Sequence, residues 1–159
     1  MKPVSRAGGL AFVLAAVVAV LDQAAKTWVV AHLTPYQTAP LLGPLRLTLI
    51  DNPGISFGLL QSGGWGRWAL AGFALLVAGS LAWWVRRTEK LYTGVALGLV
   101  IGGALGNFFD RVRFGSVVDF VDARNLLFPW IFNLADSAIT VGIVLLLIEG
   151  LFFDKRRAV

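Results

Sequence analysis

The sequence predicts an α-helical membrane protein with four transmembrane helices and a small extracytoplasmic β-cradle with a loop or lid. Hydrophobic residues make up 57% of the 159 residues, and the mean hydropathy is +0.76. Charged residues contribute only 14%, whereas a typical soluble domain is about 45–50% apolar and about 25% charged. A soluble chain of this length could not bury so much apolar surface.

Four stretches are apolar and long enough to cross a membrane, since a spanning helix needs about 20 mostly apolar residues. We expect a single integral membrane domain, 1–159, with spans at about 8–30, 65–85, 91–109 and 131–153. A basic start before an apolar run also fits a cleaved signal peptide. Because the first apolar run continues to Val30 and three more spans follow, we expect it to be retained as a helix.

Basic residues predict the orientation of the chain. They precede the first span, fill the link between the second and third, and follow the fourth: Lys2 and Arg6; Arg86, Arg87 and Lys90; Lys155, Arg156 and Arg157. The positive-inside rule then places both termini in the cytoplasm. The net charge of +5 is therefore a topology signal, and we expect no nucleic-acid partner because no basic face with stacking aromatics stands outside the spans.

Two longer segments, about 31–64 and 110–130, then lie on the extracytoplasmic side. Alternating side chains predict short strands at 45–50 and 117–121. A small β-element on the membrane surface fits this pattern. The third span carries glycines at every fourth position, Gly94, Gly98, Gly102 and Gly106, which predicts that another helix approaches it closely.

The composition also limits the chemistry. The chain has no cysteine and a single histidine, His32, which excludes thiolate chemistry and argues against a histidine-rich metal site or a Ser-His-Asp triad. We expect neither a cofactor nor a metal.

Polar residues gather at the outer ends of the predicted spans. Asp22 and Lys26 are four residues apart on one helix face, so they can pair; both a structural ion pair and a substrate contact fit. Asn107 and Arg111 have the same spacing at the end of the glycine-rich span. We interpret Asp110 and its neighbour Arg111 as a structural pair.

Two carboxylates stand apart from these pairs. Asp119 lies in the predicted strand, and Asp136 shares a face with Asn133 at the start of the fourth span; neither Asp has a basic residue at helical spacing. If both carboxylates face one cavity, one of them keeps a proton. The ionised partner can then activate a water that attacks an amide, and the protonated partner can assist the carbonyl and the leaving nitrogen.

Other functions use similar residues. A proton-coupled transporter also needs intramembrane acids, although it would place them near the bilayer midplane. A structural subunit would use the polar groups only to lock helices together. Cleavage by another intramembrane aspartyl route would place both acids inside helices, unlike Asp119.

Five motifs in order make the chain resemble the prolipoprotein signal peptidases (signal peptidase II), which are aspartyl proteases of the bacterial inner membrane. The resemblance covers essentially the whole chain. The motifs are Asp22-Gln23-x-x-Lys26, Asn52-x-Gly54-x-x-Phe57, Gly102-Gly103-Ala104-x-Gly106-Asn107-x-x-Asp110-Arg111, Val117-Val118-Asp119-Phe120 and Phe132-Asn133-x-Ala135-Asp136.

The resemblance implies an endopeptidase that cuts diacylglyceryl-modified prolipoproteins just before the lipidated cysteine. It implies a catalytic pair, Asp119 and Asp136, near the extracytoplasmic face. It also implies a set of substrate-binding or supporting residues: Asp22, Lys26, Asn52, Gly54, Asn107, Arg111, Asn133 and Ala135. Membrane lipid and inhibitors of the globomycin type are the implied partners, and we expect a monomer.

One loop departs from the family pattern. The family often has Asn-x-Gly-Ala-Ala-Phe, whereas this chain has Ile55 and Ser56 at the two alanine positions. The difference concerns substrate preference and loop packing rather than the reaction.

Overall fold

A computed structural model describes residues 3–54, 64–126, 128 and 130–153. The helices are α1 (Arg6–His32), α2 (Gly64–Val85), α3 (Leu91–Arg113) and α4 (Leu134–Ile148), with a short π-helix, η2 (Glu149–Phe153), after α4. The strands are β1 (Thr38–Leu42), β2 (Leu45–Asn52), β3 (Val117–Asp122) and β4 (Ile131–Phe132), and a 3-10 turn, η1, covers Arg124–Leu126. All four long helices are apolar enough to span a membrane, which confirms the predicted fold class.

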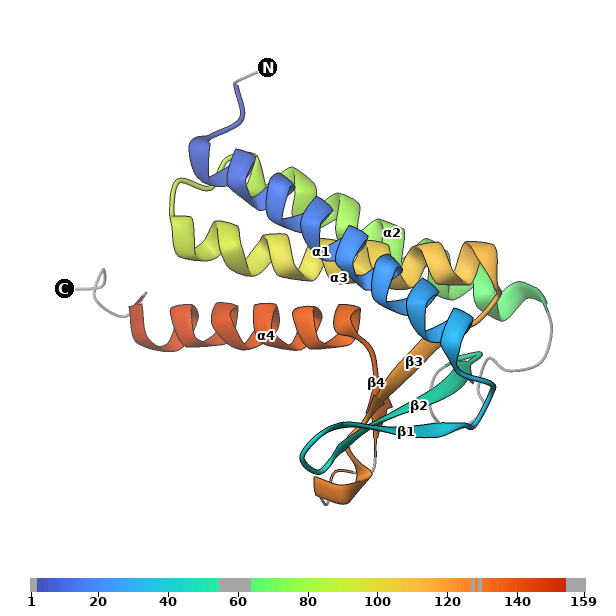
Figure 1. Ribbon diagram of the computed structural model, residues 1–159. Helices are drawn as coiled ribbons and strands as arrows, with labels where there is room; N and C mark the ends of the chain where they lie inside the picture. Colours follow the sequence, from blue (N-terminus) through green and yellow to red (C-terminus); the bar gives the residue numbers. More distant parts are fainter. Residues whose placement is uncertain (1–2, 55–63, 127, 129, 154–159) are drawn as a thin grey trace.

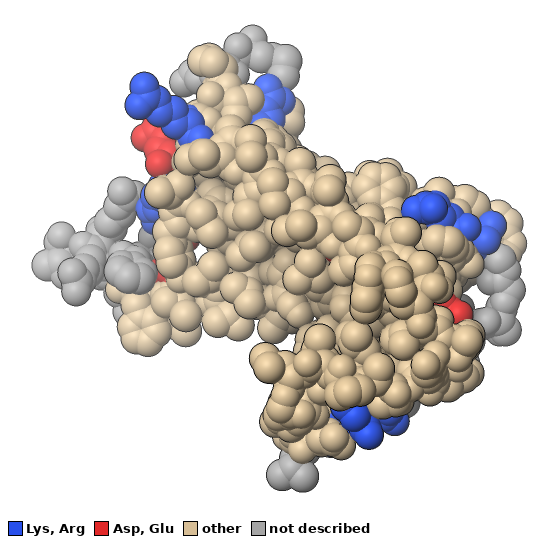
Figure 2. Space-filling view, viewed as in Figure 1, with Lys and Arg blue, Asp and Glu red and all other residues tan. Residues whose placement is uncertain are grey.

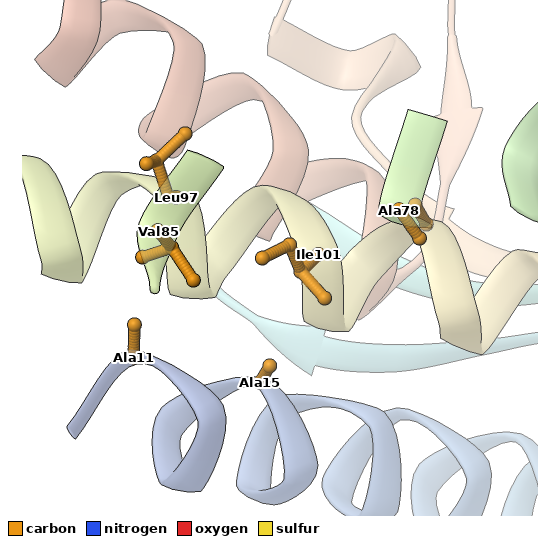
Figure 3. Close-up of a cluster of buried hydrophobic side chains, with 7 residues drawn as sticks. Ala11, Ala15, Ala78, Val85, Leu97 and Ile101 are labelled. Carbon is orange, nitrogen blue, oxygen red and sulfur yellow. The ribbon is translucent and has the colours of Figure 1, made fainter. Parts of the chain in front are cut away.

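Helix α3 is the centre of the bundle, and the other three helices pack against it. Side chains of α1, α2 and α3 meet in one buried cluster (Figure 3): Ala11, Ala15, Ala78, Val85, Leu97 and Ile101. Figure 2 shows charged side chains at the ends of the bundle and on the sheet, separated by an uncharged belt. This distribution suits helices whose outer faces contact lipid.

The glycine-rich face of α3 contacts α1, as the spacing predicted. A Cβ added to Gly94 would lie 2.9 Å from the carbonyl oxygen of Ala7. A Cβ on Gly102 would lie 2.7 Å from that of Ala15. Because these contacts are with backbone atoms, any larger residue would push the two helices apart.

The sheet is antiparallel, with strand order β1-β2-β3-β4. It lies beside the end of the bundle where α1 ends and α4 begins (Figure 1). Strands β2 and β3 confirm the two predicted strands, whereas β1 and β4 were not predicted. Val29 of α1 packs with Leu49, Val118 and Phe120 of these two strands, so an apolar contact attaches the sheet to the bundle.

Several helix boundaries differ from the expected spans by a few residues, and two of these differences lie beside the sheet. Helix α3 continues to Arg113 instead of ending near 109, and α4 begins at Leu134 instead of 131. Ile131 and Phe132 pair with Asp122 and Val121 of β3, because these residues close the sheet before the helix starts. The helix therefore begins three residues after the expected start at about 131.

Candidate active site

Asn133 and Asp136 form the N-terminal cap of α4. The Asn133 side chain accepts a hydrogen bond from the Asp136 backbone N–H at 2.9 Å, and Asp136 Oδ2 accepts one from the Asn133 N–H at 3.3 Å. This reciprocal capping box satisfies backbone donors that a helix start leaves unpaired. It also fixes the Asp136 carboxylate at the positive end of the helix dipole.

Asp119 lies on β3 and is only 4% exposed. It accepts hydrogen bonds from Asn133 Nδ2 at 2.7 Å and from Asn52 Nδ2 at 3.1 Å. The pKa of Asp119 is raised to about 6, chiefly by burial; the nearby Asp136 adds to the rise, and the two amide donors oppose it. The side chain can therefore hold a proton under conditions in which an exposed aspartate would not.

Three asparagines share one arrangement around the two carboxylates. Each amide oxygen accepts from a fixed donor, and each amide nitrogen donates to Asp119 or Asp136. Asn52 Oδ1 accepts from the Gly54 N–H at 3.2 Å. Asn107 donates to Asp136 Oδ1 at 2.7 Å. The site thus surrounds its two acids with amide donors whose orientation the backbone and a lysine determine.

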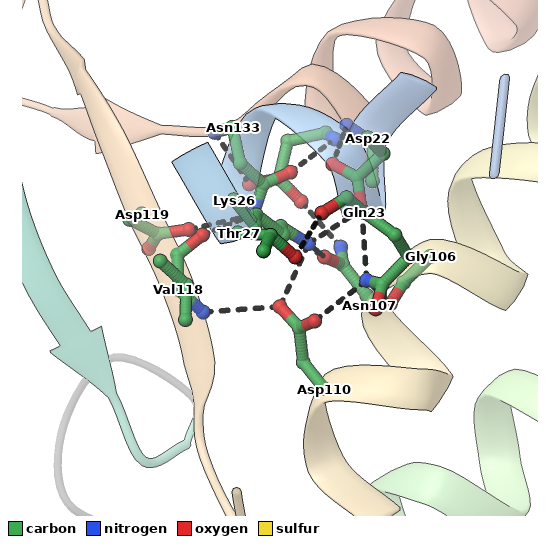
Figure 4. Close-up of polar contacts among 12 residues, drawn as sticks. Asp22, Gln23, Lys26, Thr27, Gly106, Asn107, Asp110, Val118, Asp119 and Asn133 are labelled. Carbon is green, nitrogen blue, oxygen red and sulfur yellow. Dashed lines mark hydrogen bonds and ion pairs between the residues drawn. The ribbon is translucent and has the colours of Figure 1, made fainter. Parts of the chain in front are cut away.

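Lys26 is that lysine, and it is 2% exposed. Its Nζ lies 2.7 Å from Asp22 and 2.8 Å from Asp110, and it donates to Asn107 Oδ1 at 3.0 Å. Figure 4 shows this network between α1, α3 and β3. The expected Asp22–Lys26 pair is confirmed, and its position inside the protein identifies it as an element that joins helices.

Asp22 and Asp110 extend the network to the neighbouring elements. Asp22 Oδ1 accepts from the Ala135 backbone N–H at 2.9 Å, which ties α1 to the first turn of α4. Asp110 Oδ2 accepts from the Val118 N–H at 3.1 Å, which ties α3 to β3. These bonds place Asp136 and Asp119 relative to the same three-residue ion cluster, Lys26 with Asp22 and Asp110.

Gly106 makes room for this cluster. A Cβ there would lie 2.5 Å from Asp22 Oδ2. Gln23 donates to the Gly106 carbonyl at 3.2 Å and to Asp110 Oδ1 at 2.7 Å. Sequence reasoning assigned no site role to Gln23 or Asp110, although both stand inside the quoted motifs.

Arg111 is the second cation near the pair. Its guanidinium donates to the Asn107 carbonyl at 3.1 Å, and it interacts electrostatically with Asp136, Asp110 and Asp119. The expected Asp110–Arg111 pair was wrong, because Asp110 turns inward to Lys26. Arg111 is half-buried.

The structure therefore brings together all ten residues that the sequence singled out. Asn52 and Gly54 reach the site from the end of β2, Arg111 from α3, and Ala135 through its backbone N–H. Ile55 and Ser56, where the loop departs from the family pattern, and Phe57 lie outside the described residues.

The buried Asp119 and the half-buried Asp136 are linked through one asparagine at one end of a four-helix membrane bundle. This arrangement defines a class: membrane enzymes equipped for aspartyl acid–base chemistry. The family model for signal peptidase (SPase) II matches residues 14–152. The lipoprotein signal peptidase of Caulobacter vibrioides is 47% identical over 97% of this chain and 94% of its own. That of Pseudomonas aeruginosa is 43% identical over 98% and 96%.

Solved structures agree with the sequence comparisons. A bacterial membrane enzyme determined at 2.3 Å by the in meso method has a TM-score of 0.84 and 28% identity, covering 100% of this chain and 96% of its own. A second bacterial membrane enzyme, at 1.9 Å, also has a TM-score of 0.84, with 29% identity over 96% and 99%. The chain belongs to the signal peptidase II family and is a protease.

Proposed function

We propose that Asp119 and Asp136 are the catalytic pair with which this signal peptidase removes the signal peptide from diacylglyceryl-modified prolipoproteins. The observation that carries the proposal is Asn133, which donates to Asp119 through its side chain and to Asp136 through its backbone. Its two hydrogen bonds hold the carboxylates at one place in the fold, which a pair of unrelated structural aspartates would not need.

The proposed reaction needs one proton shared by the pair. The ionised carboxylate takes a proton from water, and the water oxygen forms a bond to the carbonyl carbon of the scissile amide. The protonated partner hydrogen-bonds to the carbonyl oxygen as negative charge develops there. When the C–N bond breaks, a proton passes to the leaving nitrogen, giving a carboxylic acid and an amine.

The remaining site residues divide by what they contact. Asp22 and Lys26 belong to the buried ion cluster, which supports the structural interpretation of this pair. Asn52 and Asn107 each donate to one of the acids. Arg111 is the residue best placed for substrate, because its guanidinium is half-buried beside the pair.

Substrate and topology follow from the same proposal. The cut falls just before the lipidated cysteine, at the extracytoplasmic face, and both termini lie in the cytoplasm. Arg86, Arg87 and Lys90 at the opposite end of the bundle support this orientation by the positive-inside rule. We propose that residues 1–159 form one membrane domain that acts as a monomer, without a metal, and that globomycin-type peptides inhibit it at the same site.

Cleavage of a purified diacylglyceryl-prolipoprotein in detergent tests the catalytic pair. Wild type, Asp119→Asn and Asp136→Asn are compared on gels, with a metal chelator present throughout. We expect product from wild type alone, with all three proteins folded by thermal unfolding. Thr27→Val is a matched control, because within the part of the chain that the structure describes the Thr27 hydroxyl bonds only to its own helix, at Gln23 O. The loss of this hydroxyl should leave cleavage intact.

The outcomes separate the alternatives. Cleavage by a folded Asp119→Asn or Asp136→Asn variant would remove that residue from the mechanism. A folded wild type that cleaves nothing would return the chain to the transporter or structural interpretations. The same assay without the diacylglyceryl group measures how far the lipid contributes to recognition.

A further inference from the structure

The buried lysine fixes which way the Asn107 carboxamide points. An ammonium group has three donors and no acceptor, so Lys26 can meet only the oxygen of that amide, and its Nζ lies 3.0 Å from Asn107 Oδ1. The amide nitrogen must then face the other way. There it donates to Asp136 Oδ1 at 2.7 Å.

A second donor enforces the same orientation. Asn133 Nδ2 lies 3.2 Å from Asn107 Oδ1, and Asn133 itself cannot turn, because its oxygen accepts from the Asp136 N–H. A flipped Asn107 would point its NH2 group at two donors and its oxygen at a carboxylate. Such a buried arrangement of unpaired polar groups is costly.

The two acids differ in their surroundings. Asp136 is half-buried at the N-terminus of a helix, where negative charge is favoured, and Arg111 interacts with it more strongly than with Asp119. Asp119 is 4% exposed on a strand, and burial disfavours its charged form. A proton shared by the pair is therefore better accommodated on Asp119.

We propose that Asp136 is the carboxylate that takes the proton from water, that Asp119 carries the shared proton, and that Lys26 maintains this division as a positioning residue acting through Asn107. The inference rests on the catalytic pair proposed above. The charged groups around that pair come from two helices besides α4: Asp22 and Lys26 from α1, Asp110 and Arg111 from α3.

The test removes Lys26 without leaving two buried carboxylates unpaired. Lys26→Met combined with Asp110→Asn keeps the formal charge of the ion cluster at −1, since Lys26, Asp22 and Asp110 sum to −1 and Asp22 alone also gives −1. Asp110→Asn alone is the matched control. For each folded variant, kcat/KM for prolipoprotein cleavage is measured as a function of pH.

We expect the acidic limb of the profile of kcat/KM against pH to move up by about one pH unit in the double variant. At a fixed pH on that limb, this shift is a tenfold loss of kcat/KM. Without Lys26, the Asn107 oxygen keeps the 3.2 Å bond from Asn133 but loses its charged donor. Asn107 therefore turns more readily and can present its oxygen to a protonated Asp136. The shift is measured relative to Asp110→Asn alone, whose own acidic limb reports what the loss of the Asp110 contacts does. Equal limbs in the double variant and its control would overturn the role of Lys26.

A further variant, Asn107→Ala, separates an effect of the Asn107 orientation from a direct effect of the Lys26 charge. If Lys26 acts through Asn107, its removal has no further effect in an Asn107→Ala protein; a shift that persists there would contradict the relay. If the double variant fails to fold, Asn107→Asp replaces it. That change keeps an oxygen toward Lys26 but removes the donor to Asp136, so an unchanged acidic limb would equally overturn the proposal.

The assignment of the proton has its own measurement. Carbon-13 NMR of the aspartate carboxyl groups in micelles, at a pH at which the enzyme is active, should show the shared proton on Asp119. A proton on Asp136 beside an ionised Asp119 would refute the assignment. Cleavage by Asp136→Asn, in contrast, would refute the catalytic pair itself. The failure of one proposal is thus distinguishable from the failure of the other.

Discussion

Asn133 performs two tasks that substitution can separate. Its oxygen caps α4 by accepting from the Asp136 N–H, and its nitrogen donates to Asp119 at 2.7 Å. Serine at this position can still cap a helix, whereas it offers no amide donor to Asp119. Alanine can do neither. We therefore expect Asn133→Ser and Asn133→Ala to share one defect and to differ in another.

The magnitudes follow from the two bonds. Because Asp119 is proposed to carry the shared proton, its bond from Asn133 joins two neutral groups and contributes about 0.5–1.5 kcal/mol. Both variants should therefore lose about 2- to 10-fold in kcat/KM. Losing an N-cap costs about 1 kcal/mol, so Asn133→Ala should be less stable than Asn133→Ser by about that amount. Prolipoprotein cleavage and thermal unfolding in the same detergent measure the two effects.

A cap far from the site provides the control. Ser5 caps α1 by accepting from the Gly8 N–H at 2.9 Å, so Ser5→Ala should lose about 1 kcal/mol of stability and keep its kcat/KM. Wild-type kcat/KM in Asn133→Ser would refute the reasoning, because it would show that the bond to Asp119 does not matter for the reaction. Equal stability of the two Asn133 variants would show that the cap does not contribute to the stability of the protein.

Three further predictions concern stability. The folded-state pKa of Asp119, about 6, lies above its usual value of 3.8, so its contribution to the free energy of unfolding is present at pH 4 and is lost as the pH rises through 6. The Asp119→Asn variant should not show this loss, which reaches about 3 kcal/mol at pH 8, when the free energy of unfolding is measured against pH. Gly102→Ala should destabilise by about 1–3 kcal/mol, whereas Gly79→Ala on α2, where a Cβ meets nothing within 4 Å, should not; equal effects would contradict the close α1–α3 packing. Glu149→Gln weakens the 2.9 Å pair with Lys90 at the far end of the bundle, so it should lower the unfolding temperature without changing kcat/KM, and a loss of kcat/KM in folded protein would contradict this separation.

Much of the fold could be predicted from local features of the sequence. Four apolar runs of sufficient length indicated the spans, and side-chain alternation indicated β2 and β3. The glycine spacing of α3 predicted the contact with α1, because residues four apart lie on one helix face. Strand β4 was missed because two residues carry no periodic signal, and its pairing with β3 displaced the start of α4.

The site was predicted in composition but only partly in its contacts. Helical spacing identified Asp22–Lys26 and Asn133–Asp136, since both pairs lie within one helix turn. Adjacency in the sequence gave the wrong partner for Asp110, because consecutive residues on a helix point in different directions. Arg111 and Asp110 therefore diverge, one toward the proposed catalytic pair and the other toward Lys26.

The sequence by itself determined the class of protein, the number of spans, the end of the bundle at which polar groups gather, and, through five ordered motifs, the family. Only the tertiary structure decided which groups touch. The bonds from Lys26 to Asn107, from Asn52 to Asp119 and from Asp22 to Ala135 join residues 81, 67 and 113 positions apart. Their partners are set by how α1, α3, β2 and α4 pack, because hydropathy and periodicity describe which face of an element is buried but not which side chain of another element lies against it.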